Sequence, residues 1–492
     1  MDARVTVEQG CLEGFLEGSI FKFLGIPYAE PPVGDLRWSA PLAKTPWRGM
    51  RPAQRFSAVC PQTVGASFDL RVTEQSEDCL YLNVWTATLD AAAEAPVMVW
   101  IHGGGNLGGA GSEDAFDGTG LAAHGAVVVT LNYRLGAFGF LAHPDAGANF
   151  GLLDVLAAVT WVRSNIGAFG GDPGNVTIFG QSAGGVAVRT LLSCPQARGL
   201  FHRAIMQSGG FGKPAFAPAW TYDRARQAAE ALFEKLGGGG LAALRHCPAA
   251  AVKEASHELS GTIPKPGEVH TPGKLTWMPV ADGDTVHADG FPGWPEDVPL
   301  MLGCVENEAR YFIRPGRPYT SELLAKMADA LCGSGADAVL RLLNRHGASP
   351  YQALDRLLTT AIFTEPAAET VRAFDALGRR LYCYHFNRQS PGSIATDELV
   401  KHTAEIRYVF GNLTGNGYYD GVDTAVSELM QQAWLSFARH GTPASPEGQA
   451  WPRYEASAPH LAWIEQHAAM RPFPVTELME EFRKIRVANS ET

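Results

Sequence analysis

One ten-residue stretch, residues 176–185, constrains the fold of this chain more than any other. It reads Val-Thr-Ile-Phe-Gly-Gln-Ser-Ala-Gly-Gly, so a short strand-forming run leads directly into Gly-x-Ser-x-Gly and then into small residues that suit a helix start. The glycines flanking Ser182 leave room for a tight strand-to-helix turn, which a side chain at either position would crowd. Such a turn presents the serine beside unpaired N–H groups at a helix N-terminus. The stretch predicts a nucleophile elbow; the alternative is a glycine-rich turn in which the serine has no chemical role.

The segments around this motif predict an α/β fold. Short apolar runs with the length of buried strands occupy residues 97–101, 126–132, 176–179, 203–207, 298–303 and 380–386. Residues 152–163 have the apolar spacing and the length of a helix. Because a strand, a helix and a second strand in that order pair in parallel, we expect a mostly parallel sheet covered by helices.

The second half of the chain is more helical than the first. Helices are predicted at residues 222–236, 241–256, 320–345, 351–378 and 425–440. Because strands of the sheet continue past these segments, we expect a single domain over residues 1–492. Its helical cap-like insertions are expected at about residues 211–290 and 315–378.

Charge and composition argue against several classes of protein. A formal net charge of −11 disfavours nucleic acid and anionic membranes as partners, and no apolar run reaches the roughly 18 residues of a membrane helix. The N-terminus lacks a signal-peptide core, which predicts a cytoplasmic protein unless a leader has been removed. Eight scattered cysteines, with no Cys-x-x-Cys pair, predict no metal site.

A glycine run after an apolar strand supplies candidate oxyanion donors. His-Gly-Gly-Gly at 102–105 directly follows the strand at 97–101, and glycine lets backbone N–H groups approach a bound carbonyl closely. We assign the N–H groups of Gly104, Gly105 and Ala183 to this role. A phosphate-binding loop is the alternative, and it is disfavoured because no Lys-Ser or Lys-Thr closes a Walker pattern.

A serine nucleophile also needs a base and an acid that orients the base. Of the 14 histidines, His402 stands out because it lies in a loop after the strand at 380–386 and follows the serine in the chain order of this triad type. Glu306 and Glu308 both follow the strand at 298–303, at the end where α/β sites collect. The chemistry of the residues leaves the choice between these two carboxylates open.

The chain resembles the type-B carboxylesterase family, which includes acetylcholinesterase and bacterial carboxylesterases. The similar motifs lie at residues 25–29, 77–84, 102–105, 132–136, 169–173 and 180–185, and in the segments containing Glu308 and His402. The resemblance implies an α/β-hydrolase fold, with a central mostly parallel sheet flanked by helices and helical cap insertions. It implies Ser182 as nucleophile, His402 as general base and Glu308 as the acid, with no metal or organic cofactor.

The implied activity is that of a serine carboxylesterase that hydrolyses neutral carboxylic esters through an acyl-enzyme. Because a triad does not define the acyl group, hydrolysis of carbamates, amides or lipid-like esters stays open. The expected partner is a small-molecule ester, and the protein is expected to be a monomer or a homodimer. A non-catalytic scaffold is disfavoured because Ser182, Glu308 and His402 are all present.

The same resemblance implies several supporting contacts. It pairs Arg37 with Glu77 and Arg134 with Asp154 as buried ion pairs, and Cys60 with Cys79 as a possible disulfide. Ser208 is expected to support the triad through a hydrogen bond. A cytoplasmic location would keep the two cysteines as thiols.

Two positions depart from the family pattern beside the candidate site. Asn106 stands where the family usually has an aromatic residue, and Gln181 stands where many members have glutamate. The neutral Gln181 predicts weaker attraction for cationic substrates. The substrate pocket is expected to involve segments 211–222, 270–278 and 311–316, with Asn106, Gln181, Phe211, Trp277 and Phe312 as candidate lining residues.

Overall fold

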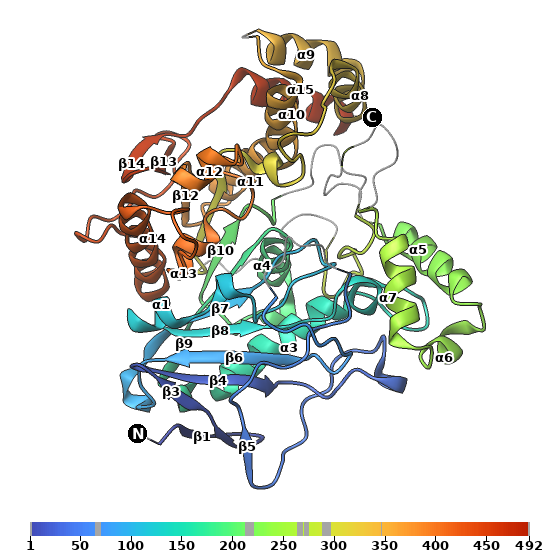
Figure 1. Cartoon of the computed structure of the whole chain (residues 1–492), viewed down its shortest axis with the longest axis vertical. Coiled ribbons are helices and arrows are strands. Elements are labelled where there is room, and N and C mark those ends of the chain that lie inside the picture. The colour runs from blue at the N-terminus through green and yellow to red at the C-terminus, as the bar shows by residue number, and fades with distance from the viewer. Residues whose placement is uncertain are drawn as a thin grey trace.

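A single large sheet organises the molecule (Figure 1). The computed structural model describes residues 2–63, 70–211, 221–262, 269, 275–287, 297–345 and 347–490. The 11 strands of the large sheet lie in the order β14-β13-β12-β11-β10-β9-β7-β8-β6-β4-β3. Their bounds are β3 (Phe15–Glu17), β4 (Ile20–Pro27), β6 (Tyr81–Thr86), β7 (Ala95–Ile101), β8 (Val127–Leu131), β9 (Gly171–Gln181), β10 (Arg203–Gln207), β11 (Leu300–Val305), β12 (Leu381–Phe386), β13 (His460–Ile464) and β14 (Ala468–Pro472).

The centre of the sheet is parallel and its edges are antiparallel. Neighbouring strands from β8 through β7, β9, β10, β11 and β12 to β13 pair in parallel. The pairs β13–β14, β8–β6, β6–β4 and β4–β3 are antiparallel. A separate small sheet contains β1 (Arg4–Val7), β2 (Gly10–Glu13) and β5 (Met50–Pro52). The prediction of a mostly parallel central sheet is confirmed.

Helices cover both faces of this sheet, and the side chains of β7 show how. Val97, Val99 and Ile101 point into the core shared with α3 (Phe150–Asn165) and α4 (Ala183–Ser193). The alternate residues of β7 pack on the opposite side with α14 (Gly421–His440). Since strand side chains alternate between faces, a strand buried on both sides reads as a continuous apolar run.

The helix α3 is the one described stretch that is long and apolar enough to cross a membrane. Together with the following 3-10 turn it spans residues 150–169 with a mean hydropathy of 1.2. More than half of this stretch is buried, because α3 packs against β9 and α4. A helix buried in the core can therefore have the same length and apolar composition as a membrane span.

The remaining helices form two groups beside the sheet, and smaller helices connect the strands (Figure 1). The first group contains α5 (Tyr222–Lys235), α6 (Gly240–Leu244) and α7 (Ala249–Glu258). The second contains α8 (Ser321–Cys332), α9 (Ala336–Asn344), α10 (Pro350–Thr359) and α15 (Glu477–Ser490), which share an apolar core of their own. The others are α1 (Thr119–Ala123), α2 (Gly136–Phe140), α11 (Glu365–Ala376), α12 (Pro391–Ala395) and α13 (Ile406–Phe410).

Three of the predicted helices are interrupted in the structure. The helix predicted at 241–256 is divided into α6 and α7 because Pro248 precedes the second helix. The helix predicted at 320–345 is divided into α8 and α9 by a 3-10 turn at Gly333–Gly335. The helix predicted at 351–378 contains a π-helical turn at Thr360–Thr364 between α10 and α11.

Both ion pairs expected from the sequence are present; Arg134–Asp154 is buried and Arg37–Glu77 is part-buried. Arg37 Nη2 lies 2.5 Å from Glu77 Oε1, and Arg134 Nη2 lies 2.6 Å from Asp154 Oδ1. The second pair is bidentate, with Arg134 Nε 2.7 Å from Asp154 Oδ2. It joins the residues after β8 to α3, so it fixes that helix on the sheet.

The two cysteines proposed for a disulfide are free thiols in the structure. Cys60 and Cys79 are both buried. A hydrogen bond with Cys60 and burial raise the pKa of the Cys79 thiol well above its usual value. The two sulfurs are therefore neighbours, and the cross-link stays a prediction for oxidising conditions.

Candidate active site

The predicted elbow is present where β9 meets α4. Ser182 stands alone between the last residue of β9 and the first of α4, with φ 57° and ψ −121°. Positive φ is strained for a residue with a side chain, and it is held here because the Ser182 N–H donates to the Gln207 carbonyl at 2.9 Å. A Cβ on Gly184 would lie 2.0 Å from the Ile101 carbonyl oxygen, so only glycine permits this approach of α4 to the sheet.

Glu308 and His402 form a buried pair in the structure. Glu308 begins the 3-10 turn Glu308–Tyr311, just after β11, and is 0% exposed, while His402 is 2% exposed. Glu308 Oε1 accepts the Val305 N–H at 3.0 Å, and Oε2 lies 2.5 Å from His402 Nδ1. A carboxylate at Nδ1 keeps the proton there and leaves Nε2 as the proton acceptor.

The glycine loop lies beside the serine in the same cavity. Gly104 and Gly105 have φ values of 102° and 63°, and their N–H groups have no hydrogen-bond partner among the described residues. The N–H of Ala183, as the first residue of α4, is likewise free of intrahelical bonds. Burial lowers the pKa of His102 to about 4, so this neighbouring ring is neutral. The three N–H groups can stabilise an oxyanion.

The cavity has a volume of about 570 Å³ and contains Ser182 and His402 in its wall. Of the candidate pocket residues, Gln181 and Phe312 line it. Residues 212–220 and 270–274, which belong to the segments expected to form the pocket, lie outside the described residues.

Three candidate pocket residues are buried and are not among the described residues that line this cavity. The Asn106 amide donates to the Trp277 carbonyl at 3.4 Å, so it faces the 275–280 segment. The indole N–H of Trp277 donates to the Ser256 carbonyl at 2.9 Å, which fixes Trp277 against α7. Phe211 belongs to the main apolar core. Their assignment to the pocket stays a prediction, since residues 212–220 and 270–274 of the expected pocket segments lie outside the described residues.

Comparison with known proteins identifies the chain. The model of the carboxylesterase family matches residues 1–480. The chain belongs to the carboxylesterase family. This esterase is 35% identical to the para-nitrobenzyl esterase of Bacillus subtilis (strain 168), over 96% of the chain and 97% of that protein. It is 33% identical to acetylcholinesterase from Bungarus fasciatus, over 96% of the chain and 84% of that protein.

A solved structure confirms the fold of the esterase. A PNB esterase structure superposes with a TM-score of 0.85 at 33% identity, covering 98% of this chain and 100% of that one. The esterase therefore has the α/β-hydrolase fold, and with the family match it is a carboxylic ester hydrolase.

Three aromatic rings surround His402 in the esterase. The ring of Phe363 lies 5.0 Å from the imidazole between centroids, and those of Phe312 and Tyr311 lie at 5.6 and 5.8 Å. Phe363 reaches this position from the π-helical turn at Thr360–Thr364. Sequence reasoning missed Phe363 because a π turn has no clear signature inside a predicted helix.

Asn307 joins the segments that carry the acid and the base. Its N–H donates to the Val400 carbonyl at 2.9 Å, and its Oδ1 accepts the Val400 N–H at 3.4 Å. Its Nδ2 donates to Asp355 at 3.0 Å. This residue, between the two candidate glutamates, therefore ties the His402 loop to β11, a role the sequence alone does not reveal.

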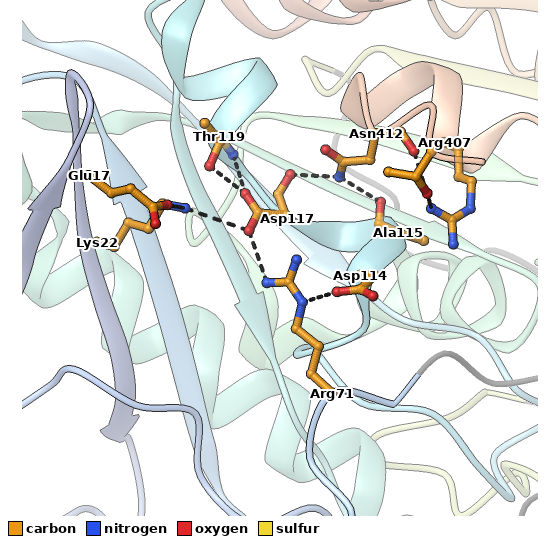
Figure 2. Close-up of polar contacts among 10 residues, drawn as sticks. Glu17, Lys22, Arg71, Asp114, Ala115, Asp117, Thr119, Arg407 and Asn412 are labelled. Atoms are coloured by element: carbon orange, nitrogen blue, oxygen red, sulfur yellow. Dashed lines mark hydrogen bonds and ion pairs between the residues drawn. The ribbon is translucent and has the colours of Figure 1, made fainter. Parts of the chain in front are cut away.

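A polar network fixes one part of the cavity wall (Figure 2). The 3-10 turn Asp114–Phe116 contributes two residues to the cavity lining. Figure 2 shows Arg71 between Asp114 of this turn and Asp117. Its Nη1 lies 3.0 Å from Asp117 Oδ2, and its Nε contacts Asp114 Oδ1. The Asn412 amide donates to the carbonyls of Ala115 at 3.1 Å and Asp117 at 2.9 Å. The turn is thus held between the segment at 70–80 and the residues after α13.

A second buried carboxyl lies close to the Glu308–His402 pair. Burial, with the charge of Glu308 as the next cause, raises the pKa of Glu405 to about 7. Its Oε1 accepts from Gln207 Nε2 at 3.4 Å, whereas its Oε2 has no partner in the described structure. The protonated form is therefore favoured in the folded esterase below neutral pH.

Replacing Glu405 with glutamine is expected to stabilise the esterase more at pH 8 than at pH 5, by about 2–3 kcal/mol. The folded pKa of Glu405 lies above its ordinary value of 4.5, so the folded state holds a proton that the unfolded chain releases. The contribution of Glu405 to stability is therefore full below pH 4.5 and declines as the pH rises to about 7. Urea unfolding of both proteins at the two pH values measures this difference.

The exposed Glu455 provides a matched control, because Glu455→Gln makes the same change away from the site. That variant should shift stability by a similar small amount at both pH values. An effect of Glu405→Gln that is independent of pH would contradict the prediction.

Ser208 does not make the supporting hydrogen bond expected from the sequence. Its side chain is fully buried, and its Oγ has no hydrogen-bond partner among the described residues. Its backbone has φ 46°, and its N–H donates to the Gly303 carbonyl at 2.9 Å. The backbone rather than the hydroxyl of Ser208 joins β10 to β11.

Within the described part of the chain, no group of three or more His, Cys, Asp or Glu residues could hold a metal ion.

Proposed function

We propose that this carboxylesterase hydrolyses neutral carboxylic esters through an acyl-enzyme formed on Ser182. The observation that carries the proposal is the 2.5 Å contact between Glu308 Oε2 and His402 Nδ1 in the wall of the cavity that also contains Ser182. That contact leaves Nε2 of His402 free of a proton, as a general base requires.

In the proposed reaction, His402 Nε2 takes the Ser182 proton as Oγ attacks the ester carbonyl. Glu308 keeps the imidazole in the productive tautomer and stabilises it when it becomes charged. The N–H groups of Gly104, Gly105 and Ala183 bind the oxyanion, and the loss of one such donor typically costs about 3 kcal/mol of barrier. The alcohol leaves with the proton from His402, and water then releases the acid by the same route.

The preference for neutral esters follows from the groups around the serine. Gln181, directly before Ser182, is neutral, and Phe312, Leu275 and the glycine loop supply apolar lining. The carboxylate of Glu308 is engaged at both oxygens, by Val305 and by His402. Neither Gln181 nor Glu308 therefore offers a free carboxylate beside the serine to attract a cationic alcohol group.

Hydrolysis of p-nitrophenyl acetate tests the proposal, with release of nitrophenol followed in the first turnover. An initial burst equal to the enzyme concentration is expected where deacylation is the slower step, because one acyl group is then held on each Ser182. Failure to turn over a series of neutral p-nitrophenyl esters of increasing acyl length would overturn the proposed function.

Choline esters are expected to be poorer substrates than their neutral isosteres. Acetylthiocholine and 3,3-dimethylbutyl thioacetate have alcohol groups of similar shape that differ by one positive charge. The kcat/KM for acetylthiocholine divided by that for the neutral thioacetate should be about 1 or lower, since no free carboxylate faces the serine from position 181. Thiol release measures both rates, and a clear preference for the choline ester would refute this expectation.

A further inference from the structure

The side chain of Gln181 contacts the imidazole of His402. Gln181 is the last residue of β9 and is 1% exposed. Its amide nitrogen Nε2 lies 3.0 Å from His402 Nε2 and 3.3 Å from His402 Nδ1. Ser182 Oγ, by contrast, makes no hydrogen bond with any described residue. In the free enzyme the base is therefore in contact with the carboxamide of residue 181.

The other groups facing this imidazole define its electrostatic surroundings. The titratable groups are Glu308 and Tyr311 from the 3-10 turn after β11, and Glu405 from the residue before α13. Lys401, the preceding residue, is paired with Glu398 at 2.8 Å. The rings of Phe312 and Phe363 complete the apolar part of the environment. Position 181 is thus the place where a neutral polar group, rather than a carboxylate, touches the ring.

An amide and a carboxylate at this position favour opposite states of the histidine. With its amide nitrogen at similar distances from both ring nitrogens, Gln181 lies over the face of the ring, where an N–H interacts favourably with the π face of neutral imidazole and unfavourably with the charge of imidazolium. A carboxylate only accepts hydrogen bonds, and its charge stabilises imidazolium at this distance. Because imidazolium cannot take the proton of Ser182, the protonated state of His402 is inactive in the acylation step.

We propose that Gln181 is a positioning residue that holds His402 in its neutral, proton-accepting form in the free enzyme. Activity then extends to lower pH than a glutamate at position 181 would allow. This inference rests on the proposed role of His402 as the general base. It concerns the acidic side of the pH profile and is independent of which ester is the best substrate.

The test compares Gln181→Glu and Gln181→Met with the wild-type esterase. We measure kcat/KM for a neutral p-nitrophenyl ester between pH 5 and pH 9. On the acidic side of the profile (the acidic limb), kcat/KM falls as the pH drops. The midpoint of this fall should lie about 1 pH unit or more higher in Gln181→Glu than in wild type, as expected for an opposite charge within about 4–6 Å. Gln181→Met removes the amide at similar length, and its limb should lie between the two. Gln449→Glu, at an exposed position, adds the same charge far from the site and should leave the limb unchanged.

A second readout separates this inference from the proposed function. The rate of inactivation by the neutral diethyl p-nitrophenyl phosphate reports attack by Ser182 and needs no ester turnover. Its pH dependence should shift in the same order among the variants. Acidic limbs of wild type and Gln181→Glu that coincide in both assays would overturn the role of Gln181. A wild-type protein that is phosphorylated at Ser182 but hydrolyses no ester would instead count against the proposed function.

Discussion

Replacing Ser182 with alanine is expected to lower kcat for p-nitrophenyl acetate by a factor of about 10⁴ or more. The variant loses the nucleophile, so no acyl-enzyme forms and the burst of nitrophenol disappears with the steady-state rate. The N–H groups of Gly104, Gly105 and Ala183 remain, and they leave a small residual acceleration over water. Stopped-flow and steady-state absorbance measure both phases.

Ser208→Ala is the matched control for this prediction. Ser208 is, like Ser182, a serine at positive φ at the end of a central parallel strand, and its hydroxyl has no described partner. The same hydroxyl oxygen is removed from a serine at the end of the neighbouring strand, and Ser208→Ala should retain activity within about a factor of three, because the Ser208 hydroxyl has no described partner on the proposed reaction path. Activity that survives Ser182→Ala would refute the assignment of the nucleophile.

The parts of the site that are local in sequence could be predicted from it. The elbow requires a strand, three small residues and a helix start within ten positions, so its structure is encoded where it stands. The central strands were also visible, because strands buried on both faces are continuous apolar runs. The strands β13 and β14, which form an antiparallel pair at one end of the sheet, were not predicted, because neither is buried along its whole length and so neither has this signal.

Contacts between distant segments could not be derived from the residues alone. Glu306 and Glu308 are equivalent as chemistry, and only the resemblance to a family favoured Glu308. The interruption of a predicted helix by a π turn decides that Phe363 reaches His402, and periodicity does not reveal such a turn. Asn106 donates its amide N–H to the Trp277 carbonyl, 171 residues further along the chain, and the sequence alone does not reveal that contact.

The two glutamates after β11 occupy different environments in the structure. Glu308 is fully buried against His402, whereas Glu306 is exposed and lies 2.7 Å from His385 Nε2. His385 stacks on Trp463 with ring centroids 4.4 Å apart, on the sheet strands β12 and β13. The Glu306–His385 pair is thus a second carboxylate–imidazole contact, and it lacks a serine elbow beside it.

Glu308→Gln is accordingly expected to lower kcat by about 10⁴-fold, while Glu306→Gln should change it by less than about threefold. A glutamine at 308 can donate its amide N–H to His402 Nδ1, which moves the ring proton to Nε2 and removes the acceptor that Ser182 needs. It also leaves the imidazolium of the transition state without a buried counter-charge. The same substitution at 306 changes only the contact with His385.

Steady-state kinetics on p-nitrophenyl acetate, with thermal unfolding of each variant as a check on folding, measures the difference. A loss confined to KM in Glu308→Gln would point to a role in binding and not in orienting the base. Equal losses of kcat in the two variants would show that the contact of Glu308 with His402 does not determine the rate. A much larger loss in Glu306→Gln would assign the acid to Glu306, against the 2.5 Å contact that Glu308 makes with His402.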